Sequence, residues 1–162
     1  IITGVVIKAD PDATLDAKTA YKLRIGIILP GMIESQAVMS GDLTIKAKQV
    51  LPKIKTDITE TTMYTSVPAD SEDRCQDVLV TKTTEDSAEI VDVILNDKNS
   101  DNIKKAFEVT YDPDTQIATV KLVNPAWVNA NTTYTIKLEA KVKGQMKDTT
   151  GPVATLKVKI LN

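Results

Sequence analysis

Apolar and polar residues alternate along residues 132–144 with the period of an extended strand. One side of this stretch carries Tyr134, Ile136, Leu138, Ala140 and Val142, and the other side carries Thr135, Lys137, Glu139, Lys141 and Lys143. Successive side chains of a strand point to opposite faces of its sheet. The pattern therefore predicts a strand with one buried face and one face in water.

Similar alternation marks most of the chain. A strand is expected from residue 17 to residue 29, where Pro30-Gly31 ends it, and another over residues 41–49. Further strands are expected at residues 1–8, at 54–58 with 63–66 as a split first strand, and at 76–83, 88–95, 107–111, 117–123 and 153–161. Residues 67–74 and 96–105 are expected to be polar loops. About seven strands at this spacing after residue 52, with no helical period, predict an all-β fold, a seven-stranded antiparallel sandwich.

Composition excludes several classes of function. The chain has no histidine, so it lacks the commonest general base and the commonest metal ligand. Its net charge is −2 with both signs interspersed, which argues against a nucleic-acid partner. No apolar run approaches the roughly 20 residues of a membrane helix, so direct membrane insertion is not expected. The chain begins with Ile1 rather than methionine, which we interpret as the start of a processed or excised piece.

The beginning of the chain repeats its end. Residues 17–25 align with residues 130–138, and residues 43–48 align with residues 156–161, at a spacing of about 113 positions. We therefore expect residues 1–50 to be the C-terminal part of an incomplete domain, and residues 53–162 to be a complete domain after a linker at residues 50–52. Half a sandwich exposes strand edges and an apolar face. Either the sequence is part of a longer chain, or another chain supplies the missing strands.

The repeated segment contains a motif with a known structural role. The run Ala-Asn-Thr-Thr-Tyr-Thr-Ile-Lys-Leu at residues 130–138 resembles the tyrosine corner of immunoglobulin-like and fibronectin type III-like sandwiches. Tyr134 and Tyr21 are the residues that match. Residues 53–162 as a whole resemble a bacterial immunoglobulin-like surface repeat of the kind found in tandem on Gram-positive anaerobes. Two features depart from antibody domains: there is no cysteine pair, and Trp127 precedes the sixth strand.

The resemblance implies a location and a set of partners. Members of such families are mostly stalks, adhesins and spacers in larger proteins that are extracellular, either on the cell surface or secreted. The expected partners are neighbouring repeats of the same chain or of another copy, together with a host or polysaccharide ligand. No cofactor is implied.

One loop has the composition of a calcium site. Asp97, Asn99, Asp101 and Glu108 offer oxygen ligands at alternating positions, followed by a distal carboxylate, as Ca²⁺ requires. The turn glycine of such loops is missing, however, and two lysines add positive charge at residues 104–105. The alternative interpretation is a solvated loop without metal.

Other candidate residues have a structural and a functional interpretation. We expect Trp127 to plug the end of an aromatic-poor core, and the alternative is a carbohydrate platform. Cys75 is interpreted as a small buried hydrophobe, or as a thiol that pairs between chains. Asp112 and Asp114 are interpreted as a hairpin turn rather than a catalytic pair. A lysine–asparagine isopeptide bond needs a buried lysine beside an acid, whereas the lysines lie mostly on faces expected to be wet.

Three hypotheses follow for the function. The first is a non-catalytic structural or adhesive immunoglobulin-like module of a large bacterial surface or secreted protein. The second is an accessory carbohydrate- or calcium-binding module of a secreted enzyme, which an exposed Trp127 in a groove or a metal at residues 97–101 would favour. The third is a filament subunit that a neighbour's strand completes. An enzyme is not expected, because no pairing of nucleophile and base is present.

Overall fold

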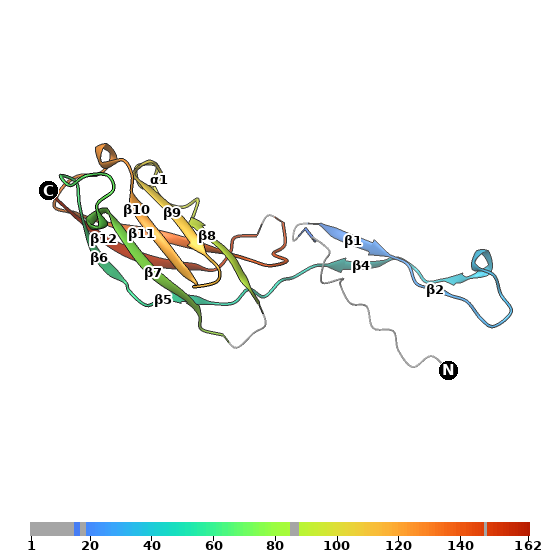
Figure 1. Ribbon diagram of the computed structural model, residues 1–162. Coiled ribbons are helices and arrows are strands. Elements are labelled where there is room, and N and C mark those ends of the chain that lie inside the picture. The colour runs from blue at the N-terminus through green and yellow to red at the C-terminus, as the bar shows by residue number, and fades with distance from the viewer. Residues whose placement is uncertain (1–14, 17–18, 85–87, 148) are drawn as a thin grey trace. The chain divides into compact units, whose positions relative to one another are not determined.

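The computed structural model describes residues 15–16, 19–84, 88–147 and 149–162, and it divides the chain into two compact units (Figure 1). The hairpin unit comprises Ile1–Val50 and Gly144–Thr149, and the sandwich unit comprises Leu51–Lys143 and Thr150–Asn162. The strand expected at residues 1–8, together with its part of the repeat, lies outside the described residues. The grouping of residues 144–149 with the hairpin unit was not foreseen from the sequence.

The sandwich unit consists of two four-stranded sheets. The first has the order β5-β7-β10-β9, with strands β5 (Ile54–Thr56), β7 (Cys75–Lys82), β10 (Ile117–Leu122) and β9 (Phe107–Asp112). The second has the order β6-β12-β11-β8, with strands β6 (Glu60–Tyr64), β12 (Val153–Leu161), β11 (Thr132–Val142) and β8 (Ile90–Leu95). This is the immunoglobulin arrangement of strands, with the first strand divided between the sheets. The β-sandwich prediction and the split first strand are confirmed.

One pairing in the sandwich differs from the antiparallel expectation. β6 runs parallel to β12, with the register Lys157↔Glu60 to Leu161↔Tyr64. The chain leaves the first sheet after β5 and continues in the same direction as the last strand. It thereby covers the free edge of β12, whose backbone groups would otherwise lack partners.

The core between the sheets is mostly aliphatic. Along β12, every second residue from Ala154 to Ile160 is buried, and the residues between them face solvent. The core cluster comprises Met63, Val78, Val80, Val93, Ile103, Ala106, Phe107, Ala118, Val120, Leu122, Val128, Ile136, Leu138, Ala140, Leu156, Val158 and Ile160. Period-two alternation on both sheets therefore creates the apolar layer that holds them together.

The polar loop expected at residues 96–105 contains a helix, which corrects the prediction. Helix α1 (Asp101–Ala106) begins after Ser100, whose hydroxyl accepts a hydrogen bond from the Ile103 N–H at 3.4 Å. Ile103 and Ala106, three residues apart, are buried in the core. Six residues are too few for a helical period to appear in the sequence. Short 3₁₀ turns occur at η1 (Glu34–Gln36), η2 (Glu72–Arg74) and η3 (Pro125–Trp127).

The described part of the hairpin unit is a ribbon of two short ladders. β1 (Ala20–Leu23) pairs with β4 (Leu43–Lys46), and β2 (Gly26–Ile27) pairs with β3 (Val38–Met39). The long strand expected at residues 17–29 is interrupted after Leu23, where the Ser40 hydroxyl accepts the Ile25 N–H at 2.9 Å in place of a backbone carbonyl. The Ser40 side chain thus replaces one bond of the ladder.

The two hairpins of the repeat share one register. Tyr21 lies opposite Ile45 in the hairpin unit, and Tyr134 lies opposite Val158 in the sandwich unit. All four pairs of β1 and β4 have counterparts 113 positions later in β11 and β12, and the last of them, Leu23↔Leu43, corresponds to Ile136↔Leu156. Because a slip of one residue would turn every side chain to the other face, the shared register shows that the repeat is structural.

Leu156 and Leu43 occupy equivalent positions of the repeat, but replacing each with alanine should change the free energy of unfolding by different amounts. The Leu156 side chain is 0% exposed and the Leu43 side chain is 39% exposed. Leu156→Ala should lower the free energy of unfolding of the sandwich unit by about 2–5 kcal/mol, because it leaves a core cavity. Leu43→Ala should change that free energy by less than about 0.5 kcal/mol. Urea unfolding followed by the fluorescence of Trp127, the single tryptophan, measures both, and equal effects would contradict the assignment of the core.

Candidate functional site

Both matching tyrosines bond back to the chain that precedes them. The Tyr134 hydroxyl accepts a hydrogen bond from the Asn129 N–H at 2.8 Å, and the Tyr21 hydroxyl accepts one from the Asp16 N–H at 2.7 Å. Each donor lies five residues before its tyrosine. This backward bond defines a tyrosine corner. Between Asn129 and Tyr134 the chain turns at Asn131, whose φ of 59° is in the left-handed region that asparagine tolerates better than most residues.

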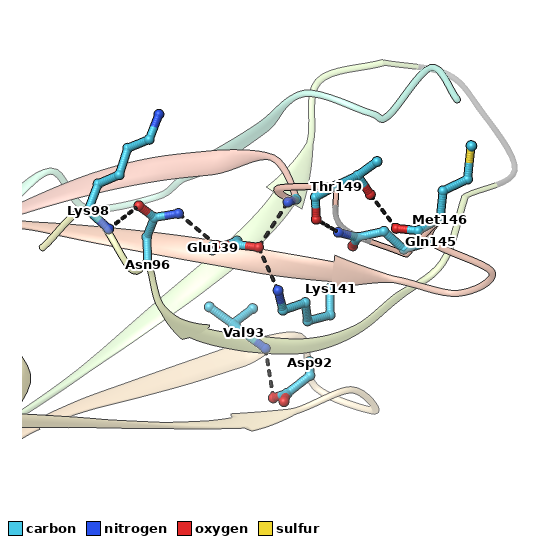
Figure 2. Close-up of polar contacts among 10 residues, drawn as sticks. Asp92, Val93, Asn96, Lys98, Glu139, Lys141, Gln145, Met146 and Thr149 are labelled. Atoms are coloured by element: carbon cyan, nitrogen blue, oxygen red, sulfur yellow. Dashed lines mark hydrogen bonds and ion pairs between the residues drawn. The ribbon is translucent and has the colours of Figure 1, made fainter. Parts of the chain in front are cut away.

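A carboxylate that the alternation of β11 places on the outward face is buried and connects three parts of the sandwich. Glu139 occupies an outward position of β11, yet it is only 4% exposed. Its Oε2 accepts a hydrogen bond from the Asn96 Nδ2 at 2.7 Å, beyond the end of β8. Its Oε1 accepts from the Lys141 Nζ at 2.6 Å and from the Gly151 N–H at 2.9 Å, just before β12 (Figure 2). We call these four residues the Glu139 cluster.

The electrostatics of the cluster favour the ionised carboxylate. Burial alone would raise the pKa of Glu139, but the bonds from Lys141, Gly151 and Asn96 and the charge of Lys141 outweigh it and hold that pKa below its usual value. The carboxylate is therefore charged at neutral pH and lies beside the Lys141 side chain. The cluster contains the residue types of an isopeptide bond, and the contacts within it are hydrogen bonds and an ion pair with Glu139.

The absence of a side chain at Gly151 permits the close backbone approach on which the Glu139 cluster depends. A Cβ at this position would lie 1.8 Å from the Ala140 carbonyl oxygen and 3.2 Å from the Glu139 Cγ. No side chain can replace the glycine without displacing the backbone. The Gly151-Pro152 pair marks a turn in the sequence, but the close approach that requires glycine is visible only in three dimensions.

The four residues proposed for calcium are in different surroundings. Asn99 is buried, where its Nδ2 donates to the carbonyls of Asn96 and Lys137 and its Oδ1 accepts the Lys137 N–H at 2.8 Å. Asp97 is exposed in the turn, and Asp101 begins α1 with its Oδ1 3.8 Å from the Lys104 Nζ. Glu108 is exposed on β9.

The described residues contain no group of three or more acidic, cysteine or histidine side chains placed to hold a metal ion. Asn99 instead holds the loop after β8 against β11 through its hydrogen bonds to the Lys137 backbone. The calcium hypothesis therefore stays a prediction, and the arrangement of the proposed ligands does not support it.

The prediction that Trp127 plugs the core is wrong. Trp127 is 40% exposed, and the Lys105 ammonium lies 4.0 Å from the centre of its ring. The turn η3 directs the next residue, Val128, into the core, and Phe107 supplies the buried aromatic ring. The indole therefore packs on the outside, against a cation. Two surface hollows of the sandwich unit, one lined by residues 60–62 with Lys157 and the other near Pro113, do not include Trp127.

The remaining candidates have structural surroundings. Asp112 Oδ1 accepts the Asp114 N–H at 3.0 Å, and its Oδ2 accepts the Thr115 hydroxyl at 2.8 Å, which confirms the hairpin-turn interpretation. The Thr115 hydroxyl and backbone bonds lower the pKa of Asp112. Cys75 begins β7, partly buried, opposite Lys121.

The similarity of this chain to a known structure is weak. No protein-family model matches the chain, and no curated protein matches it. Among solved structures, the human desmocollin-1 ectodomain is similar with a TM-score of 0.46 and 15% sequence identity over 78% of this chain. The match spans 25% of the desmocollin chain. At this level the similarity supports no argument about function, so the sandwich assignment depends on the sheets themselves. Within the described residues, no helix is both long and apolar enough to cross a membrane.

Replacing Glu139 tests the role of its charge. Glu139→Gln removes the ion pair with Lys141 but keeps the shape of the side chain. It should lower the free energy of unfolding at pH 7 by about 2–3 kcal/mol, the usual cost of losing hydrogen bonds to a charged group. Glu108→Gln, on the exposed face of β9, is the matched control and should have little effect. Chemical denaturation of both variants makes the comparison.

The Glu139→Gln variant should also differ from the wild type in how its stability depends on pH. The pKa of Glu139 is depressed in the folded state, so its contribution is complete above the unfolded value of about 4.5 and is lost as the pH falls through the folded pKa. The wild-type chain should lose stability below about pH 4.5, and Glu139→Gln should lose less over that range. Parallel pH profiles would show that the carboxylate is not the titrating group.

Removing a hydroxyl tests the tyrosine corner. Tyr134→Phe should lower the free energy of unfolding of the sandwich unit by about 0.5–1.5 kcal/mol, because the Asn129 N–H loses its partner. Tyr111→Phe is a control on β9. Thermal unfolding of both variants measures the difference, and an unchanged Tyr134→Phe protein would show that the bond is energetically neutral.

Proposed function

We propose that the chain is a non-catalytic segment of a tandem array of immunoglobulin-like β-sandwich modules in a bacterial surface or secreted protein. The array acts outside the cell as a spacer or adhesive stalk. Its partners are neighbouring modules of the same kind, together with whatever host or polysaccharide ligand the whole protein binds.

The observation that carries this proposal is the repeated hairpin. The tyrosine corner and the strand register recur together at a spacing of about 113 residues, which is the length of one sandwich. A repeat of this length is typical of modules joined end to end, each with its own core. The Glu139 cluster in the sandwich unit bonds one part of the fold to another.

Stretching the protein tests the tandem arrangement. Each sandwich that unfolds should release about 113 residues, which is about 37–41 nm of extended chain. Force spectroscopy on the full natural polypeptide should therefore show repeated unfolding events at one common spacing in that range. The sandwich unit with Leu156→Ala is the control, since its event should occur at lower force with the same length. Events of unrelated lengths would contradict a tandem array.

A further inference from the structure

Arg74 is a buried cation without a carboxylate partner. It ends η2, directly before β7, and it is 8% exposed. The ion pairs of the described residues do not include Arg74. Glu139, the other buried charged side chain among these residues, pairs with Lys141 and accepts two further hydrogen bonds. The two buried charges of the sandwich unit therefore differ, because only Glu139 has a counter-charge.

The Arg74 guanidinium uses only part of its hydrogen-bonding capacity. Its Nη2 donates to the Thr65 carbonyl oxygen at 2.7 Å, whereas its Nε is buried and has no hydrogen-bond partner. Among the buried side-chain nitrogen and oxygen atoms of the described residues, this Nε is the only one without a partner. A buried donor without an acceptor costs free energy, and so does a buried charge without a counter-charge. A negatively charged acceptor would remove both costs.

The acidic residues nearest to Arg74 in the sequence do not supply this acceptor. Asp70, Glu72 and Asp73 are exposed, and none of them forms an ion pair within the described part of the chain. The turn is closed by other bonds, since the Ser71 hydroxyl accepts the Asp73 N–H at 3.2 Å and the Ser71 carbonyl accepts the Arg74 N–H at 3.1 Å. The arginine is thus turned into the sandwich while the three carboxylates lie in water.

Arg74 lies at the end of the sandwich where β6 and β12 finish. Thr65, which accepts the Arg74 bond, directly follows β6, and its N–H and hydroxyl donate to the Leu161 carbonyl oxygen at 2.9 and 3.2 Å. Residues 65–74 cross here from β6 in one sheet to β7 in the other. The guanidinium is therefore reached from this end, past a loop, rather than through the packed core.

We propose that Arg74 anchors a binding site for a carboxylate at this end of the sandwich unit. A carboxylate is planar and can accept two parallel hydrogen bonds from one guanidinium. It also carries a single negative charge, so the buried pair is neutral, whereas a phosphate or sulfate dianion would leave one negative charge uncompensated. The site goes beyond a spacer role and does not depend on the tandem arrangement, because every residue in it belongs to one sandwich.

Nuclear magnetic resonance of the arginine Nε–H groups tests the site directly. The chain has two arginines, Arg24 and Arg74, so it gives two such signals. Sodium acetate is added to the 162-residue chain at pH 7, with sodium chloride at the same ionic strength as the control. Acetate should shift the Arg74 signal until it saturates and leave the Arg24 signal in place, and chloride should shift neither. Arg24→Met assigns the two signals.

Thermal unfolding with and without acetate gives a second measurement. At several times the acetate dissociation constant, the wild-type midpoint should rise by about 2–4 °C over the chloride control, because the ligand binds only the folded state. Arg74→Met, which removes the charge and keeps most of the length, should show no such rise. Arg24→Met is the matched control, since Arg24 is exposed and paired with Asp42, and it should keep the wild-type response. If Arg74→Met does not fold, the wild-type titration decides alone.

The source of the carboxylate is distinguished with a short peptide that contains one glutamate, compared with its glutamine version. Tighter binding of the glutamate peptide than of acetate supports an acidic side chain of a partner protein. Acetate binding that is equal or tighter supports a free organic acid.

Three results would overturn the proposal. The first is a wild-type Arg74 signal that does not respond to acetate, and the second is an equal response to acetate and chloride or at both arginines, which indicates an adventitious ion only. The third is an acetate response that appears only in Asp70→Asn, Glu72→Gln or Asp73→Asn, because one of the chain's own carboxylates is then the partner of Arg74.

Discussion

Burial of two aliphatic faces against each other is the constraint on which the structure depends. The inward residues of β11 and β12 are covered because β7 and β10 present a complementary apolar layer, and these residues contribute at roughly 25 cal/mol for each Å² of apolar area removed from water. The described part of the hairpin unit has the same register and the same tyrosine corner, with Leu23 and Leu43 more exposed than their counterparts. The local hairpin geometry therefore recurs in two different surroundings.

Period-two alternation allowed the strands of the sandwich to be predicted, because each strand has one buried face. It also allowed β5 and β6 to be recognised as a divided first strand. The same reasoning failed where a side chain's environment depends on distant residues. Glu139 has an outward position in β11, yet Asn96 and Gly151 cover it. Trp127 is apolar but lies outside, because a single 3₁₀ turn decides whether residue 127 or 128 points inward.

The polar residues of the sandwich unit act mainly on the fold itself. Asn99 bonds to both backbone groups of Lys137, and the Glu139 cluster joins the end of β8 to the start of β12. Both attachments lie on β11, the strand next to β12 and β8 in its sheet. Aliphatic packing holds the two sheets together, and these buried polar contacts fix the loops at the edges.

The parallel pairing of β6 with β12 determines how the sandwich responds to tension. The chain enters the unit just before β5 and β6 and leaves it at the end of β12. A pull on these two points drags two parallel strands in opposite directions along their common axis. The bonds of this pairing are then loaded together in shear rather than opened one after another.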